Sequence, residues 1–384
     1  MIGSILAETG TTPHTLESRQ NPAAPLPIDV VELGDRYVFR NQISGAIVLS
    51  DRRGLDVLKV LQTPTRSDPE PEFLDLLHRE WSAAGLLDKQ PSDKPVVREQ
   101  IFEFQAEFSK AGRRVNVIAN CPRVFGEVAT MLSAYRVRAS SEIDSEIVVE
   151  RTGNTYVVYD NGRAIFRPGT IDEARFLALQ TAIATLAGRS QTSAVLHAGL
   201  VAKDGVGVLI AGGSGAGKTT LVLDLVRDGW EFGGDDLIAV TGDRGAVATV
   251  PCLANVKSDS HLDTCGEIGA LGCWLERRGG FVDVKARLSS PGSVQIGCVL
   301  FPKFGSGKPA TCRSVSGAEA LQRLLTTGSE VVQPVNSVSP LVALLRQAGC
   351  FEIEYGCSTS ALTLVDATLN VGRMASHCLE QNVA

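Results

Sequence analysis

Short apolar runs alternate with amphipathic stretches along most of the chain, and each predicts an element. Residues 206–211 (Val-Gly-Val-Leu-Ile-Ala) are apolar and rich in β-forming residues, which predicts a buried strand. After a glycine-rich stretch, apolar residues recur at helical spacing from Leu221 to Val226, and Gly229 predicts the end of that helix. The pattern therefore predicts a strand, a turn and a helix in succession.

The N-terminal part has a different pattern. Residues 1–27 are polar and rich in Thr, Pro, Ser and Gly, so we expect a loose, disordered leader with no signal peptide or membrane anchor. Apolar runs at 37–39 and 46–49 predict short strands, followed by a helix to about Gln62.

A second amphipathic helix is predicted at about 72–84, with Gly85 as its end. These elements make a small α+β unit over 28–90. Residues 91–99 are polar and contain two prolines, which indicates a linker.

Residues 100–190 are predicted to form a strand-rich subdomain. The apolar runs that predict strands are 101–104, 115–118, 146–149 and 156–159. The sequence Asp160-Asn161-Gly162 predicts a tight hairpin turn, and a helix capped by Asp172 should end near Gly188.

Residues 191–384 have the pattern of an α/β domain. A hairpin is predicted between residues 194–202 and 206–211, with Asp204-Gly205 in the turn. The other predicted elements are a strand at 295–301, a helix from the capping box at 316–319 to about 327, a helix from Ser339 closed by Gly349, and a strand at 351–355.

Composition limits the classes of function. The 384 residues are 44% apolar and 21% charged, which is typical of a soluble globular protein with two or three domains. The net charge of −6 argues against nucleic acid or an anionic membrane as partner. Nine cysteines without metal-site spacing indicate free thiols in a reducing compartment, so we expect a cytoplasmic enzyme.

The glycine-rich stretch between the predicted strand and helix fits the phosphate-binding pattern G-x-x-x-x-G-K-[ST]. Its residues are Gly212, Gly213, Ser214, Gly215, Ala216, Gly217, Lys218 and Thr219. Glycines allow successive N–H groups to converge on an anion at a helix N-terminus. We expect this stretch and Thr220 to bind ATP, with Lys218 on the outer phosphates and the Thr219 hydroxyl on Mg²⁺.

Two adjacent acids, Asp235 and Asp236, come soon after the helix and before an apolar run at 237–240. Such a pair beside a phosphate loop can divide the work, one acid holding Mg²⁺ and the other accepting a proton from an attacking hydroxyl. The alternative is a solvated turn with no chemical role.

The order of these features resembles the HPr kinase/phosphorylase superfamily. The likeness is carried by Leu-His-Ala-Gly-Leu-Val at 196–201, the glycine-rich loop, and Gly-Gly-Asp-Asp at 233–236. It implies a phosphate-loop core like that of the HPr kinases and PEP carboxykinases, and ATP and Mg²⁺ as cofactors. Homo-oligomers occur in that family, and the sequence leaves this state open.

The resemblance also implies roles for individual residues. Asp235 would be the general base on a seryl or threonyl hydroxyl, Asp236 would help to bind the metal, and Lys218 would hold the transferred phosphoryl. His197 would touch the nucleotide phosphates, although a structural hydrogen bond explains a histidine in a strand equally well.

A further acid is a metal candidate. The sequence Glu-Ile-Gly-Ala-Leu-Gly at 267–272 is similar to a glutamate motif of the family but lacks its arginine. Glu267 is therefore a candidate metal ligand, and the missing arginine argues against reverse phosphorolysis. Nearby cations could neutralise charge on a transferred phosphoryl; they are Lys257, Arg277, Arg278, Lys285 and Arg287.

The N-terminal unit resembles the PqqD-like, winged-helix-like modules that recognise leader peptides in enzymes acting on ribosomally made peptides. Gly-Ala-Ile-Val-Leu-Ser at 45–50 and Trp-Ser-Ala-Ala-Gly-Leu-Leu at 81–87 carry this likeness. It implies that a peptide binds within residues 28–90, pairing with a strand edge. A small capping unit without a ligand is the alternative.

These observations predict an ATP-dependent kinase that phosphorylates a Ser or Thr hydroxyl of a peptide or small protein, with a ribosomally made precursor peptide of the lasso type as the first candidate. One alternative is a regulatory kinase for a phosphocarrier protein or a metabolite. A second is a non-catalytic protein that binds peptides in a nucleotide-dependent way.

Overall fold

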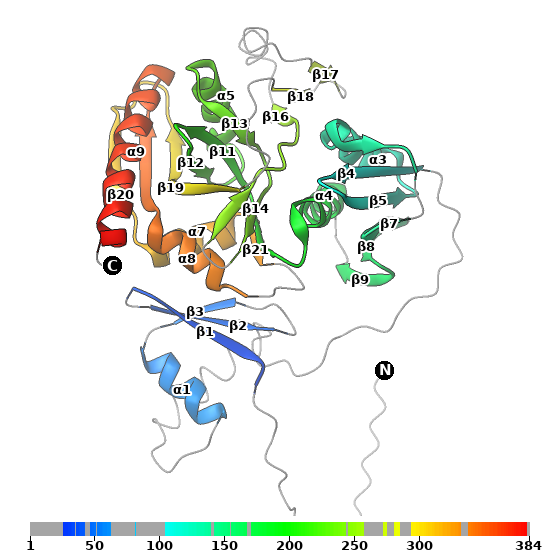
Figure 1. Cartoon of the computed structure of the whole chain (residues 1–384), viewed down its shortest axis with the longest axis horizontal. Helices are drawn as coiled ribbons and strands as arrows, with labels where there is room; N and C mark the ends of the chain where they lie inside the picture. Colours follow the sequence, from blue (N-terminus) through cyan, green and yellow to red (C-terminus); the bar gives the residue numbers. More distant parts are fainter. Residues whose placement is uncertain are drawn as a thin grey trace, which may run out of the picture.

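The computed structural model describes most of the chain from residue 26 onward (Figure 1). The described residues are 26–34, 36–42, 47–50, 52–62, 81, 104–139, 142–153, 155–166, 170–242, 245–256, 272–274, 280–284, 293–331 and 337–381. They form a mixed α/β protein with sheets of ten, six, three and three strands. No helix among them has both the length and the apolar character needed to cross a membrane.

The ten-stranded sheet is built from the C-terminal half of the chain. Its strand order is β13-β11-β12-β19-β15-β14-β10-β21, and β22 joins β19 and carries β20. The bounds are β10 (Thr192–Leu196), β11 (Ala198–Lys203), β12 (Val206–Ala211), β13 (Glu231–Gly234), β14 (Ile238–Thr241), β15 (Ala246–Ala248), β19 (Ser293–Phe304), β20 (Thr311–Ser314), β21 (Glu330–Val331) and β22 (Gly349–Tyr355).

The strand directions bring four carboxyl ends to one edge of this sheet. β12 is parallel to β19, and β19 is parallel to β22. β13 has the same direction as β12, because both are antiparallel to β11 between them. The residues that follow β13, β12, β19 and β22 therefore meet at the edge where α/β proteins bind ligands.

Helices cover both faces of the sheet (Figure 1). On one face lie α5 (Lys218–Arg227) and α9 (Ser358–Gln381), and on the other lie α7 (Gly317–Thr326) and α8 (Ser339–Gln347). Val208 and Ile210 of β12 belong to the apolar cluster of α5 and α9, whereas Leu209 and Ala211 belong to that of α7 and α8. Burial on both faces explains why residues 206–211 form a continuous apolar run.

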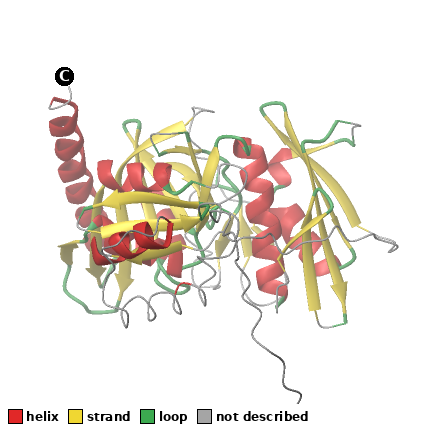
Figure 2. Ribbon diagram, turned by 90° about the horizontal axis from the view of Figure 1, so that it is seen from below, coloured by secondary structure: helices red, strands yellow, loops and turns green. Residues whose placement is uncertain are grey.

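The segment before this sheet forms the six-stranded sheet, with helices packed against it (Figure 2). Its strands in spatial order are β6 (Arg136–Val137), β4 (Phe104–Lys110), β5 (Arg113–Ala119), β7 (Ser145–Thr152), β8 (Thr155–Asp160) and β9 (Arg163–Phe166). The helices are α3 (Pro122–Met131), a 3-10 turn at Ser133–Tyr135, and α4 (Ile171–Gly188). Asn161 and Gly162 between β8 and β9 both have positive φ, of 48° and 81°, as the predicted hairpin turn requires.

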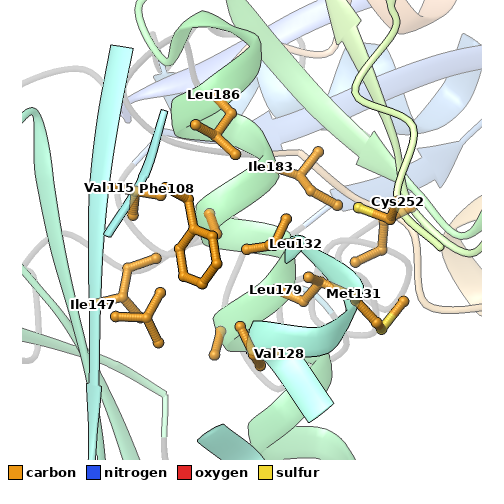
Figure 3. Packing of buried hydrophobic residues seen from close by; sticks show 14 of the residues in the cluster. Phe108, Val115, Val128, Met131, Leu132, Ile147, Leu179, Ile183, Leu186 and Cys252 are labelled. Carbon is orange, nitrogen blue, oxygen red and sulfur yellow. The ribbon is translucent and has the colours of Figure 1, made fainter. Parts of the chain in front are cut away.

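Helix α4 joins the two larger sheets into one core (Figure 3). Its residues from Ala178 to Gly188 are all buried. Leu179 and Ile183 share one cluster with Phe108 of β4 and Val195 of β10. A helix that is apolar all round is buried all round, so α4 is an internal layer of the molecule.

The N-terminal sheet is formed by β1 (Ile28–Leu33), β2 (Arg36–Asn41) and β3 (Ile47–Ser50), followed by α1 (Arg52–Gln62). Leu33 and Val38 pack into the cluster of α7 and α8, and Phe39 packs on the other face against Leu58 of α1. Buried Arg40 donates to the carbonyl oxygen of Val331 on β21 at 3.2 Å. This sheet is thus attached to the core of the ten-stranded sheet.

A second three-stranded sheet, β16-β18-β17, lies near α5. Its strands are β16 (Ala254–Val256), β17 (Gly272–Trp274) and β18 (Gly280–Val282).

Several sequence predictions are wrong in detail. The strand predicted over 194–202 is interrupted at His197, because β10 pairs with β14 whereas β11 pairs with β12. The cap of α4 is Thr170, which forms a reciprocal capping box with Glu173, and Asp172 lies inside the first turn. Of the strand predicted at 101–104, only Phe104 lies within the described residues, and there it begins β4, Phe104–Lys110.

Other elements were not predicted. The strand β1 follows the polar leader, α3 contains a glycine, and α9 carries many polar residues, so none has a strong local signal. Of the helix predicted at 72–84, only Trp81 lies within the described residues. The predicted domain boundaries remain predictions.

Candidate functional site

The glycine-rich loop follows β12 and leads directly into α5, at the sheet edge described above. Gly215 and Gly217 have φ of +82° and +92°, a region that favours glycine. A Cβ on Gly217 would lie 3.3 Å from the Tyr355 hydroxyl oxygen, so a side chain at this position is crowded as well as strained. The loop backbone therefore depends on glycine at this point.

The side chain of Lys218 folds back over its own loop. Its Nζ donates to the carbonyl oxygens of Gly212 at 2.8 Å and Gly213 at 3.3 Å, and the residue is only 8% exposed. The ammonium group is thus held at the loop, next to the N-terminus of α5. The charge of the ammonium group and the partial positive charge of the helix N-terminus both favour an anion at this position.

Asp235 is linked to the loop by a hydrogen bond. The Thr219 hydroxyl donates to Asp235 Oδ2 at 2.9 Å, and the backbone N–H of Asn255 donates to the same oxygen at 3.2 Å. Asp235 is 1% exposed, and its Oδ1 has no hydrogen-bond partner among the described residues. Burial first, and then the neighbouring Asp236 charge, raise the pKa of Asp235 to about 6.

Asp236 faces a different partner. Its Oδ1 lies 3.0 Å from His197 Nε2, and its backbone has a positive φ of 73°. His197 Nδ1 donates to the Thr327 carbonyl oxygen at 2.6 Å, and the His197 N–H donates to Ser329 Oγ at 3.0 Å. The two ring nitrogens thus face two oxygen atoms, and the imidazole bridges Thr327 and Asp236.

The contact with His197 lowers the pKa of Asp236. Burial raises the pKa of Asp236, but the hydrogen bond from His197, together with the charges of His197, Arg175 and Lys218, outweighs burial, and the pKa is lowered below its usual value. The adjacent carboxyls of Asp235 and Asp236 are therefore shifted in opposite directions, the usual sign of two acids with different tasks.

A cavity of about 620 Å³ joins these groups. Its lining includes His197 and Asp236, Lys218 and Thr219 of the loop and α5, and Phe304 and Tyr355 from the ends of β19 and β22. Asp235 lies behind the lining, whereas Asp236 is part of it. The volume is within the range of small-ligand sites.

No protein-family model matches the chain, and no curated protein matches it. Among solved structures the chain is similar to the Hpr(Ser) kinase/phosphatase from Coxiella burnetii, with 15% identity, a TM-score of 0.26, and coverage of 47% of this chain and 96% of that one. A similarity of this size carries no argument about function. The interpretation of the cavity therefore depends on its own geometry.

The donor set fits a nucleotide with Mg²⁺. The Thr219 hydroxyl and the partnerless Oδ1 of Asp235 are hard oxygen ligands next to the loop that would hold phosphates. In the described part of the chain no three His, Cys, Asp or Glu side chains converge on one point, so a Mg²⁺ at this site would take its other ligands from phosphate and water.

The structure brings together most of the residues that the sequence singled out: the loop, Thr220, the two acids and His197. Glu267 lies outside the described residues, as do the five cations Lys257, Arg277, Arg278, Lys285 and Arg287.

Sequence analysis missed several residues of the site. They are Asn255, Phe304, Thr327, Ser329 and Tyr355. Each is far from the loop in the chain and belongs to no motif. The only sequence signals near them were the predicted ends of two strands, at 301 and 355, which lie close to Phe304 and Tyr355 at this sheet edge.

Proposed function

We propose that this chain is an ATP-dependent kinase that transfers the γ-phosphoryl group to a Ser or Thr hydroxyl of a peptide or small protein. One observation carries the proposal: the hydrogen bond from Thr219 to Asp235, which joins the glycine-rich loop to the acidic pair at one cavity. Phosphoryl transfer needs this combination of phosphate grip, metal ligands and a base.

The loop amides and Lys218 would hold the β- and γ-phosphates. Thr219 and Asp235 would hold Mg²⁺, because they touch each other and Asp235 has a free oxygen in a buried position. When bound, Mg²⁺ neutralises charge on the phosphates. Occupation of the site requires Asp235 to be ionised, and its raised pKa shows that ionisation costs free energy until a cation is present.

Asp236 is the better candidate for the general base. From the resemblance we expected Asp235 in this role, but Asp235 is buried behind the cavity wall whereas Asp236 lines the cavity. A base must be within reach of the proton that it accepts. The substrate hydroxyl would give its proton to Asp236 as its oxygen bonds to phosphorus and the bond to the bridging oxygen breaks, releasing ADP.

His197 would hold the Asp236 carboxylate in position and in its ionised form. Its ring lies between the Thr327 carbonyl and Asp236, so it fixes the carboxylate and favours the ionised form. A carboxylate that is ionised at neutral pH can accept a proton late in a loose transition state.

A second cavity is the candidate site for the peptide. It has a volume of about 630 Å³ and lies between the N-terminal sheet and α7, lined by Ile47 and Leu49 of β3 and by Leu321 and Leu325 of α7. Within the described residues β3 pairs only with β2, which leaves it as an edge strand. An edge strand beside apolar pockets can bind an extended peptide by strand addition.

The test is phosphate transfer from labelled ATP, with Mg²⁺, to Ser- and Thr-containing peptides and to free amino acids or sugars as small acceptors. We expect labelled peptide from the wild-type protein and none from Lys218→Ala, with Lys203→Ala as the control because Lys203 pairs with Asp366 outside the cavity. Binding of ATP without transfer to any peptide would instead support a non-catalytic, nucleotide-dependent binding protein.

A further inference from the structure

One side of the cavity has no part in the proposed transfer step. Phe304, the last residue of β19, lines this side and is 59% exposed, the largest value among the exposed large apolar side chains of the described residues. An exposed aromatic ring in the wall of a ligand cavity offers a flat apolar surface that a ligand can cover.

Phe304 has a second aromatic residue behind it. The ring centroids of Phe304 and Tyr355 are 5.8 Å apart, at an interplanar angle of 58°. Tyr355 is 4% exposed, so the pair presents the Phe304 ring to the cavity. The packing of Tyr355 holds this ring in place.

The pair lies directly beside the phosphate loop. A Cβ built on Gly217 would be 3.5 Å from Phe304 Cβ and 3.3 Å from the Tyr355 hydroxyl oxygen. A ligand held by the loop would therefore be within reach of the Phe304 ring.

The sheet sets the direction in which such a ligand must lie. The acids follow β13 and the loop follows β12, whereas Phe304 and Tyr355 end β19 and β22 on the opposite side of the loop strand. A triphosphate whose terminal group lies at the acids has its other end on the side of β19 and β22. The phosphate tail and the ring of Phe304 thus mark two ends of one site.

We propose that Phe304, supported by Tyr355, is the platform on which the base of the bound nucleoside triphosphate stacks. This inference rests on the proposed function, since it takes a nucleotide as the ligand of the loop. Every base has a flat π face, so stacking distinguishes a nucleotide from a bare polyphosphate and does not by itself distinguish ATP from GTP.

The test compares ligands with and without a base. Dissociation constants of ATP and of inorganic tripolyphosphate are measured by calorimetry with Mg²⁺ for the wild type, Phe304→Ala, Phe304→Trp and Val371→Ala. Val371 is a matched control, because it is also an exposed apolar residue (54%) but does not line the cavity.

We expect Phe304→Ala to weaken the binding of ATP by about 5- to 150-fold, the range of one stacked base, and to leave the binding of tripolyphosphate unchanged. Phe304→Trp should restore ATP affinity, and Val371→Ala should have no effect. Three results for Phe304→Ala would contradict the proposed platform. They are equal weakening of ATP and tripolyphosphate binding, an unchanged affinity for ATP, and a rise only in the KM for the peptide.

The wild-type protein separates this inference from the proposed function. If it binds neither ATP nor tripolyphosphate, the proposed function and the platform both fail. If it binds ATP and transfers phosphate while Phe304→Ala behaves like the wild type, only the platform fails.

Discussion

Two cavities of nearly equal volume, about 620 and 630 Å³, differ in the pairing of the charged groups around them. The first lies at the carboxyl edge of the ten-stranded sheet and contains an ammonium, an ion pair and a carboxylate at its wall. The second lies between the N-terminal sheet and α7, and its lining mixes apolar side chains from both with polar ones such as Arg36, Glu319 and Gln322.

The two cavities differ in whether the charged groups around them have partners. Around the first, Asp235 is buried with an oxygen that has no partner in the described residues, an arrangement that costs free energy and makes sense for a site that receives a cation. Around the second, the charges of Glu319 are paired with Arg313 and Arg323. Volume alone therefore does not distinguish the two cavities, whereas the buried carboxylate oxygen without a partner in the described residues does.

The largest effect should come from Asp236→Asn, which removes the proposed base. We expect single-turnover transfer from labelled ATP to peptide to fall by about 10²- to 10⁴-fold, the usual contribution of a general base. ATP affinity should change by only a few fold, because the loop and Lys218 remain. Asp228→Asn, an exposed acid at the end of α5, is the control.

The companion variant Asp235→Asn separates the two acids. It should weaken binding of ATP in the presence of Mg²⁺, since a metal ligand is lost. If Asp235→Asn abolished transfer with normal ATP binding, while Asp236→Asn kept its rate, the assignment of base and metal ligand would be the reverse of the one proposed.

A second large effect concerns stability and pH. The pKa of Asp235 is about 6 in the folded protein and 3.8 for the free side chain, so the folded state holds a proton that the unfolded state releases. Stability from this group is fully present below about pH 4 and is lost as pH rises through 6, by about 3 kcal/mol. Asp235→Asn should remove this part of the pH dependence.

The measurement is urea unfolding between pH 4 and 8 with EDTA, comparing the wild type with Asp235→Asn and Asp228→Asn. If the free energy of unfolding changed with pH equally in the wild type and in Asp235→Asn, the pKa of the buried Asp235 carboxyl would not be raised. Added Mg²⁺ and ATP should stabilise the wild type above pH 6 more than they stabilise the variant.

A smaller effect is expected from His197→Gln. Without the hydrogen bond from His197, burial of Asp236 is opposed only by charges such as those of Arg175 and Lys218, so its pKa should rise. The acid limb of the pH–rate profile should then move to higher pH, and on that limb the rate should fall about 10-fold for each unit by which the pKa exceeds the assay pH. A uniform loss of rate at all pH values would indicate a purely structural role for His197.

The smallest effect tests the second cavity. Leu49→Glu places a charge beside the apolar side chains of Ile47 and Leu321 in the groove between β3 and α7, and we expect the KM for a peptide substrate to rise about 10-fold with an unchanged KM for ATP. Ile165→Glu, at an exposed apolar position on β9, is the matched control. A rise in the KM for ATP, or equal effects of both variants, would argue against peptide binding in the groove.

Point variants are better probes of the second cavity than removal of the N-terminal sheet. Leu33 and Val38 pack into the same cluster as Leu341 and Leu345 of α8, and Arg40 bonds to the backbone of β21. Deletion of the sheet would expose this apolar surface and change the stability of the whole protein.

The sequence by itself determined the parts of this protein that depend on neighbours in the chain. The strand, loop and helix from 206 to 227 follow from a continuous apolar run, glycines and helical spacing. The Asn161-Gly162 turn and the Ser316 cap likewise depend on local backbone chemistry.

Only the tertiary structure decided which acid lines the cavity and what surrounds it. Asp235 and Asp236 are adjacent in sequence, and their difference comes from contacts with Thr219, Asn255 and His197, which strand pairing brings together. Phe304 reached the loop through the parallel pairing of β12 and β19, whose residues are about ninety positions apart. The burial and the ionisation of these side chains depend on such long-range packing, which cannot be predicted from a local sequence pattern.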